Sequence, residues 1–431
     1  MMLPAVSVQQ GSLPNGLRVV TVELPHLHGV TVCAYVRVGS RFETASDSGL
    51  SHFLEHMLFR GTARLPSAFE LNRAVEDLGG TLYAETRRDS SLYQIALPQE
   101  TAHQGLQLLG EILTQPAFTQ IEVERRIILE EMQEDLDERG EDINLSDLIC
   151  AALWPGHPLG QKITGPVANV RRFDEADLRR HFATHYGASN MVLCVSGGVR
   201  HDEVMAWAQE ALAALPRGQI HPVVAPPPLS PGPRRVHRDG ETGPQTTLNV
   251  AFRCFGELDP DFPALIVLGR LLDDGMSTRL YQRVVNELGL AYYVGAGMEA
   301  MVDTGIYELE ATATHASVPA LVSEIFELLR LLREQPPTPQ ELDKARRRYR
   351  WDLIASHDEP GTMADLFGRT ALYYPPPTLQ ERLERVLAVT AEDVQRVAQQ
   401  VLRREAMVVG TVGRLSSRLR AEVQAAIDRF D

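Results

Sequence analysis

The chain has 431 residues, 44% of them hydrophobic and 23% charged, which is typical of a soluble globular protein with room for two large domains. Its formal net charge of −15 argues against a nucleic acid partner and disfavours anionic membrane surfaces, because like charges repel. Four widely spaced cysteines, an N-terminus without a signal-peptide pattern and the lack of a membrane-length apolar run predict a cytoplasmic protein with no membrane contact.

The first predicted elements are two strands. Asn15-Gly16 is a hairpin dipeptide, and the valine-rich stretch that follows at residues 17–24 is typical of a strand. A second strand is predicted at residues 30–40. Buried free thiols are expected because three of the cysteines lie in apolar runs of this kind: Cys33, Cys194 and Cys254.

A helix is predicted at residues 49–60, which includes most of the stretch SHFLEHMLFRGT. Ser48 is expected to be its N-cap and Gly61 to end it. Its apolar side chains recur at the spacing of one buried helix face, and these residues are Leu50, Phe53, Leu54, Met57 and Leu58.

Two histidines and a glutamate share the opposite stripe of this helix. His52 and His56 are one turn apart, so both imidazoles can reach one metal ion, and Glu55 lies beside them, near enough to hold a water molecule. A polar stripe opposite a core stripe is often simply solvated. A chance H-x-x-E-H is expected only roughly 0.03 times in a chain with 13 histidines, so half of a metal site is the favoured interpretation.

A glutamate-rich helix is predicted to supply the third ligand, since catalytic zinc sites usually have three protein ligands and a water. The stretch IEVERRIILEEMQEDLDERGED holds the largest supply of carboxylates. Glu124 and Glu131 are seven residues apart, hence on one face after two turns. Spacing leaves three competitors open, and a run of charges is usually a solvated face. The competitors are Glu130, Glu134 and Glu138.

The second half of the chain echoes the first. Residues 216–234 are dense in proline and glycine, which predicts a linker between a first domain at residues 1–215 and a second at residues 235–431. TTLNVAFRCFGELD then resembles VTVCAYVRVGSRFE, and PPTPQELDKARRRYRWDL resembles PAFTQIEVERRIILEEM. We therefore predict an α+β fold of two homologous domains related by duplication, each a mainly antiparallel sheet packed with helices. The second half has no counterpart of the two histidines and the glutamate.

HFLEHMLFRGT followed by ERRIILEE resembles the pitrilysin/insulinase family of inverted-motif zinc metallopeptidases, in the small bacterial branch similar to mitochondrial processing peptidase. The match runs nearly end to end, through LPNGLRV, VEDLGG, HPLGQKITGP and LGLAYYVGAG. The resemblance implies that Glu131 is the third metal ligand and Glu124 a supporting acidic residue. It also implies that the two domains form half of a clam-like chamber, which two chains, or one double-length chain, complete.

The chemistry that follows is that of a zinc endopeptidase. One Zn²⁺ per chain would be held by His52, His56 and Glu131, would act as a Lewis acid, and would lower the pKa of a water in its fourth position. Glu55 would be the general base on that water and would pass the proton to the leaving amine, while Glu124 orients a ligand or the base.

Peptide substrates are expected along an edge strand, where an extended chain adds by main-chain hydrogen bonds. This favours unstructured peptides over folded proteins, and the alternative is an ordinary edge strand protected by its charges. Family members often have Asn in place of Tyr83 and an aromatic residue in place of Glu85, which leaves the cleavage preference open. The resemblance places the strand at Leu82, Tyr83, Ala84, Glu85 and Thr86.

The second half departs from the family at one pair of residues. Active relatives carry an Arg seven residues before a Tyr, whereas counting back from Tyr292, a catalytic candidate, gives Val285. Arg283 is two residues away, which points it about 200° around a helix axis. We therefore expect a heterodimer in which this chain supplies zinc and a related partner supplies the Arg/Tyr pair. The alternatives are a homodimer that uses Arg283, a non-proteolytic zinc-binding structural subunit, and a peptide-binding protein.

Overall fold

The computed structural model describes residues 2–229, 233–240 and 243–430, so residues 230–232 of the predicted linker lie outside the described part. By contact, the chain divides into two compact units, each with segments from both halves of the sequence. The division into domains at residues 1–215 and 235–431 stays a prediction. The first unit contains the chain up to Met132, Gln161–Val224 and Asp352–Leu379, and the second contains Gln133–Gly160, Ala225–Trp351 and the chain from Gln380 onward.

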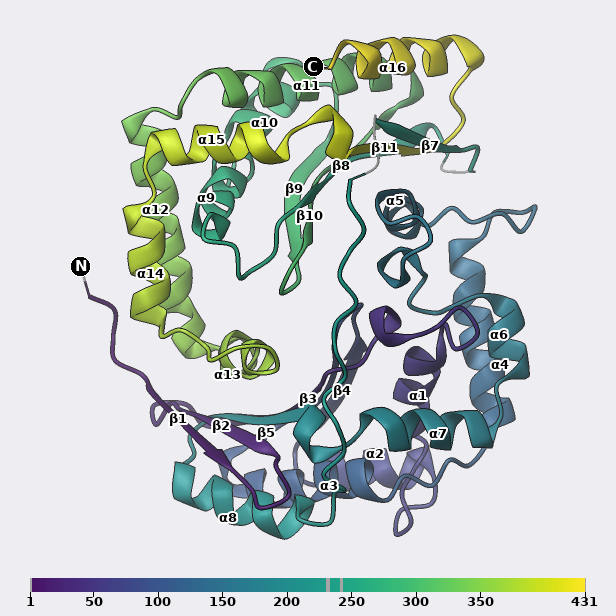
Figure 1. Ribbon diagram of the computed structural model, residues 1–431, viewed down its shortest axis with the longest axis vertical. Helices are drawn as coiled ribbons and strands as arrows, with labels where there is room; N and C mark the ends of the chain where they lie inside the picture. Colours follow the sequence, from purple (N-terminus) through teal and green to yellow (C-terminus); the bar gives the residue numbers. More distant parts are fainter. Residues whose placement is uncertain (1, 230–232, 241–242, 431) are drawn as a thin grey trace. The chain divides into compact units, whose positions relative to one another are not determined.

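Six strands form the sheet of the first unit, in the order β1-β2-β6-β3-β5-β4. Figure 1 labels β1 to β5 of this sheet. Neighbouring strands are antiparallel except for β2 and β6, which are parallel. The two strands predicted near the start of the chain are present as β2 and β3. The bounds are β1 (Ser7–Ser12), β2 (Arg18–Glu23), β3 (Gly29–Val36), β4 (Thr81–Thr86), β5 (Ser91–Pro98) and β6 (Met191–Gly197).

The sheet of the second unit repeats this topology with five strands in the order β7-β11-β8-β10-β9. Its one parallel pair, β7 and β11, occupies the place of β2 and β6, and the other neighbours are antiparallel. The predicted duplication and the mainly antiparallel sheets are therefore confirmed. The bounds are β7 (Arg234–Arg238), β8 (Gln245–Cys254), β9 (Tyr293–Ala300), β10 (Gly305–Thr314) and β11 (Met407–Val412).

Helices pack on both sheets, and one short helix of each unit comes from the other half of the sequence. Helix α5 packs against β8 and β11, whereas α13 packs against β3 and β6. Helices before α9 are α1 (Leu50–Leu58), α2 (Ala68–Glu76), α3 (Ala102–Thr114), α4 (Ile121–Glu131), α5 (Leu145–Leu153), α6 (Val167–Arg172), α7 (Glu175–His185) and α8 (His201–Leu212). The later helices are α9 (Phe262–Leu272), α10 (Arg279–Tyr281), α11 (Val318–Glu334), α12 (Pro339–Ala355), α13 (Pro360–Ala364), α14 (Leu379–Ala388), α15 (Ala391–Val401) and α16 (Ser417–Arg429).

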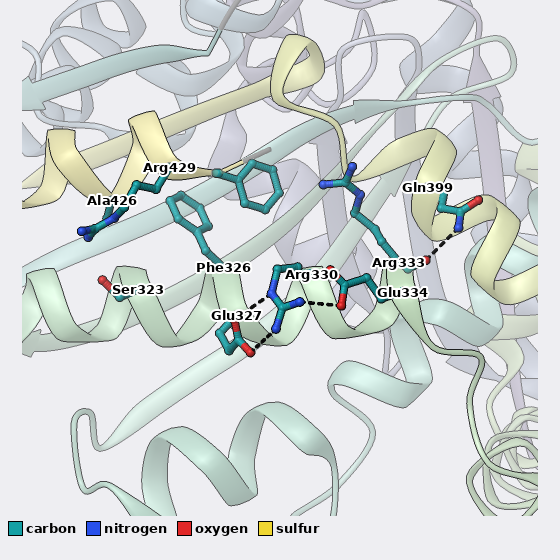
Figure 2. Close-up of a pocket in the computed structure, with 10 residues that line it drawn as sticks. Ser323, Phe326, Glu327, Arg330, Arg333, Glu334, Gln399, Ala426 and Arg429 are labelled. Carbon is teal, nitrogen blue, oxygen red and sulfur yellow. Dashed lines mark hydrogen bonds and ion pairs between the residues drawn. The ribbon is translucent and has the colours of Figure 1, made fainter.

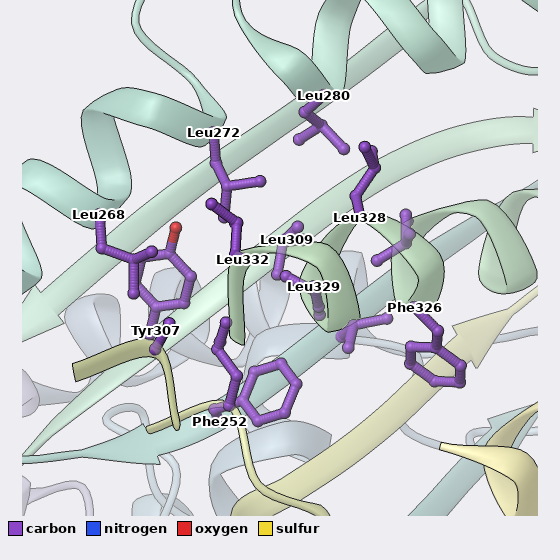
Figure 3. Close-up of a cluster of buried hydrophobic side chains, with 14 of the residues drawn as sticks. Phe252, Leu268, Leu272, Leu280, Tyr307, Leu309, Phe326, Leu328, Leu329 and Leu332 are labelled. Atoms are coloured by element: carbon purple, nitrogen blue, oxygen red, sulfur yellow. The ribbon is translucent and has the colours of Figure 1, made fainter. Parts of the chain in front are cut away.

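Each unit has its own hydrophobic core, because alternate residues of a strand point to one face of the sheet. In the first core, Val32 and Ala34 of β3 join the apolar side of α1. In the second, Figure 3 shows Tyr307 and Leu309 of β10 among the leucines of α9 and α11. Each fully buried Leu or Phe contributes about 1.5–3 kcal/mol to stability, so these faces fix how the helices lie on the sheets.

The structure also shows the state of the cysteines and the length of the helices. All four cysteines are buried free thiols, as expected for three of them, and burial raises the pKa of Cys33, Cys194 and Cys254. Every helix in the described part of the chain is too short or too polar to cross a bilayer.

Candidate metal centre

Helix α1 is fixed in rotation by its apolar stripe, and this turns the histidines toward α4. All five predicted core residues of the helix are buried, at 0–1% exposure. The opposite stripe, with His52, Glu55 and His56, faces α4 and the strand β4, both of which contact α1. His52 itself is buried at 8% exposure, so this stripe is not simply solvated.

The predicted ends of this helix need correction. Its N-cap is Gly49, at a positive φ of 96°, and not Ser48. The helix also ends at Leu58 rather than at residue 60, with Phe59 as its C-cap. The physical reason at the N-terminal end is that the backbone N–H groups donate to the carboxylate of Glu43, so no local capping side chain is needed.

Three donor groups converge where α1 meets the last residue of α4. Nε2 of His52 lies 3.5 Å from Oε1 of Glu131, and Nε2 of His56 lies 3.5 Å from Oε2. The three ligand atoms lie within 4.8 Å of one another, and no other set of three His, Cys, Asp or Glu side chains does so within the described residues. The structure thus brings Glu131 to the histidines and leaves out the three glutamates that spacing left open.

The distances between the histidine Nε2 atoms and the oxygens of Glu131 fit a zinc ion. Bonds of about 2.0–2.1 Å at tetrahedral angles place two ligand atoms about 3.3 Å apart, close to the separations found here. The same separations are longer than an ordinary hydrogen bond between nitrogen and oxygen. The side chains are therefore arranged as ligands around a shared point rather than as a bonded pair.

Glu124 contacts His56 at the ring nitrogen that does not face Glu131. Its Oε1 lies 2.7 Å from Nδ1 of His56, and its Oε2 accepts a hydrogen bond from Nε of Arg60. Burial lowers the pKa of His56, but the hydrogen bond and charge of Glu124, together with the charges of Glu55 and Glu131, raise it overall. Burial raises the pKa of Glu124, whereas its bonds to His56 and Arg60 outweigh burial and lower it overall. Because an ionised Glu124 can only accept a hydrogen bond, we infer that Nδ1 of His56 donates to it, which leaves Nε2 for a metal.

The carboxylate of Glu131 is ionised at neutral pH. Its interaction with His52 lowers its pKa more than burial raises it. Its side chain is 44% exposed, so solvent or a substrate can approach the centre from this side.

Glu55 lies outside the set of three ligands and is held by the edge strand. Oγ1 of Thr86, the last residue of β4, donates a hydrogen bond of 2.5 Å to Oε2 of Glu55. Thr86 is predicted to bind substrate through main-chain hydrogen bonds, and in the structure its side-chain hydroxyl is turned to the catalytic candidate Glu55. The sequence analysis did not identify two contacts of the candidate site. These are the contact of Arg60 with Glu124 and the contact of Thr86 with Glu55.

Strand β4 is an edge of its sheet, as predicted, so no strand of the described residues pairs with its outer side. Leu82 and Ala84 pack against the first core. Tyr83, 51% exposed, and Glu85 point to the other face, where Glu85 pairs with Arg87 at 3.0 Å. Of the five predicted substrate residues, Tyr83 and Glu85 are thus the two whose side chains face away from α1.

The second unit contains the residues at which the sequence differs from the pattern of the family it resembles. Val285 packs against the second core, within a π-helical segment at Gln282–Glu287. Arg283 is engaged by two carboxylates, Glu324 at 2.8 Å and Glu287 at 3.0 Å. Arg283 is therefore held within the second unit by two ion pairs. Tyr292 is 93% exposed.

A hollow of about 810 Å³ lies in the second unit between α11, α15 and α16 (Figure 2). Arg330 at its wall is paired with Glu327 and Glu334, so its charge is already balanced. None of the described residues that line the hollow is a histidine, a cysteine or a candidate ligand of the metal centre. Its lining residues are Ser323, Phe326, Glu327, Arg330, Arg333, Glu334, Gln399, Ala426, Arg429 and Phe430.

Comparison with known proteins gives matches over nearly the whole chain. Two family models match: insulinase (peptidase family M16) at residues 18–167 and the peptidase M16 inactive domain at residues 172–349. An uncharacterized zinc protease of Mycobacterium bovis is 31% identical over 97% of both chains. A protein named probable mitochondrial-processing peptidase subunit beta, from Arabidopsis thaliana, is 31% identical over 95% of this chain and 79% of its own length. A protease from Helicobacter pylori has the same fold, with a TM-score of 0.88 at 22% identity over 95% of this chain and 100% of its own.

Proposed function

Because the chain belongs to the insulinase family of peptidases, peptidase family M16, we propose that it is a zinc-dependent endopeptidase that hydrolyses unstructured peptides. The observation that carries the proposal is the convergence of His52, His56 and Glu131 from two helices. Two imidazoles and one carboxylate suit zinc, and relatives named zinc proteases support the choice of metal.

Each protein group in the centre has a separate role. Zinc, when bound by His52, His56 and Glu131, supplies a Lewis acid that polarises the scissile carbonyl and makes a water molecule more acidic. Glu55 takes the proton of the attacking water on its carboxylate and returns it to the leaving amine nitrogen. Thr86 keeps that carboxylate in place, and Glu124 acts through His56 by fixing its ring.

Substrate peptides add to the open edge of β4. Main-chain hydrogen bonds supply the affinity, and side chains of the peptide meet Tyr83 and Glu85 on one face of the strand. Only an unfolded segment can present its main chain in this way, which makes folded proteins poor substrates. The strand ends at Thr86, which contacts Glu55, so a peptide bound here runs toward the general base.

A related partner completes the site. Val285 stands where active relatives carry an Arg, and Arg283 is held by Glu324 and Glu287. The chain therefore contributes the zinc half, and a partner carrying the Arg/Tyr pair contributes the other half. Its similarity to a protein named as a subunit supports this arrangement. The buried free thiols suit a reducing compartment, so we propose a cytoplasmic location.

A non-proteolytic zinc-binding subunit is the second candidate, favoured by Val285 and by the match to the inactive-domain model. A peptide-binding protein without chemistry is the third. Hydrolysis of quenched fluorescent peptides, by the chain alone and by the complex purified from its native source, separates them. Chelation should abolish hydrolysis and added zinc should restore it. A complex that contains zinc but cleaves nothing would support the second candidate, and peptide binding unchanged by chelation would support the third.

A further inference from the structure

The first turn of α1 is held by a carboxylate from outside the helix. Oε2 of Glu43 accepts the N–H of Gly49 at 2.9 Å, and Oε1 accepts the N–H of Ser51 at 2.6 Å. Glu43 is 3% exposed, and no ion pair to it occurs in the part of the chain that the structure describes. Burial raises the pKa of its carboxyl to about 7, although the hydrogen bonds from Ser51 and Gly49 lower it. One buried side chain thus satisfies two N–H groups at the start of the helix.

The two histidine ligands are oriented in different ways. Nδ1 of His56 is held by the carboxylate of Glu124. Nδ1 of His52 is buried and has no hydrogen-bond partner among the described residues. A metal-binding histidine usually has its second nitrogen held by a neighbouring group. Because His52 lacks such a group, the direction of its ring depends on the backbone that carries it.

That backbone is the turn that Glu43 holds. Ser51 immediately precedes His52, and its N–H donates to Glu43. The hydroxyl of Ser51 lies 3.0 Å from Nε2 of His181, a second buried contact on the same residue. Ser51 is therefore fixed through both its main chain and its side chain, from two separate parts of the fold.

We propose that Glu43 is a positioning residue for the metal centre: by holding the N–H groups of Gly49 and Ser51, it sets the direction in which His52 presents Nε2. Glu43 orients His52 through the backbone of the helix, whereas Glu124 orients His56 through a direct contact with its ring. The inference rests on the metal centre of the proposed function. It concerns metal affinity and not a chemical step.

The zinc affinity of the full chain, measured by competition with a chromophoric chelator, tests this role. Glu43→Ala should raise the Kd for zinc about tenfold or more, the range seen when a partner of a metal ligand is removed. Glu43→Gln keeps one oxygen that can accept an N–H, so it should raise the Kd by a smaller factor. In both variants without zinc, amide hydrogen exchange in the first turn of α1 should be faster than in the wild type.

Ser67→Ala is a matched control, since Ser67 caps α2 in the same unit by accepting the N–H of Glu70. It should lower the melting temperature but leave the zinc Kd unchanged. If Glu43→Ala does not fold, Glu43→Gln decides. A folded Glu43 variant with wild-type zinc affinity would overturn the positioning role alone. A wild-type chain that binds no zinc would overturn the proposed function itself, so the two failures are distinguishable.

Discussion

Nδ1 of His56 lies 2.7 Å from Oε1 of Glu124, so the group that orients this histidine comes from the same helix as Glu131, two turns earlier. One helix therefore supplies both a metal ligand and the support for another. The contact also has an electrostatic effect, because it raises the pKa of His56 against the effect of burial. A protonated imidazole cannot bind a metal, so protons compete with zinc at this ring.

Replacing the supporting carboxylate should change both the strength and the pH dependence of zinc binding. In Glu124→Gln, zinc affinity at pH 8 should fall about 10- to 100-fold, because the ring of His56 is less well oriented. The pKa of His56 should fall as well, so protons compete less at this ring, and the zinc Kd, taken relative to its value at pH 8, should begin to rise on acidification at a lower pH than in the wild type. Chelator competition across a pH series measures both effects.

Glu122→Gln is the control for this prediction, since Glu122 lies on the exposed side of the same helix and pairs with Arg125. It should bind zinc like the wild type at every pH. An unchanged affinity and pH profile in Glu124→Gln would show that Glu124 does not support the ligand.

Glu55→Gln should separate metal binding from catalysis. The amide keeps the size of the side chain but cannot accept a proton, so turnover of a fluorescent peptide should fall about 10²- to 10⁴-fold. Zinc content should stay at the wild-type level, because Glu55 lies outside the three ligands. Retained turnover would end the general-base role, and loss of zinc would make Glu55 a structural ligand.

Thr86→Val tests whether the edge strand holds the general base. Removing the hydroxyl breaks the hydrogen bond to a charged oxygen of Glu55, so kcat should fall about 10- to 100-fold with little change in KM or zinc content. Thr86→Ser keeps the hydroxyl and should retain most of the activity. If Val and Ser variants lose activity equally, the hydrogen bond is not what positions Glu55.

Arg283→Ala distinguishes the two kinds of dimer. In the heterodimer, Arg283 only pairs with Glu324 and Glu287, so its loss should leave kcat and KM of the complex within about twofold of the wild type. A homodimer that uses Arg283 in catalysis would lose most of its turnover. The same assay on the chain alone is informative, since full activity without a partner contradicts the heterodimer.

The local features of the metal centre could be predicted from the sequence. The spacing of apolar residues predicts the rotation of α1, and that rotation places both histidines on one side. The same spacing does not identify how the helix begins. The N–H of Gly49 donates to Glu43, which reaches the helix only in the folded chain. Seven-residue spacing pairs Glu124 with Glu131, but their different roles depend on the angle between two helices, which no local pattern encodes.

Long-range packing marks the limit of the sequence-based prediction of the fold. Helices α5 and α13 each bury apolar residues, and their local sequence does not say which sheet they cover. In the structure, each covers the sheet of the other half. The duplication could be predicted because it leaves similar segments in the same order along the chain. The exchange of α5 and α13 between the sheets leaves no such pattern in the sequence.

The zinc content of the purified chain is the most direct test of the metal centre, with Glu131→Gln and its neighbour Glu130→Gln compared side by side. The wild type and Glu130→Gln should each hold about one zinc per chain, whereas Glu131→Gln should lose the metal at the same free zinc concentration. Glu131→Gln that keeps its zinc, or Glu130→Gln that loses it, would contradict the ligand set of His52, His56 and Glu131.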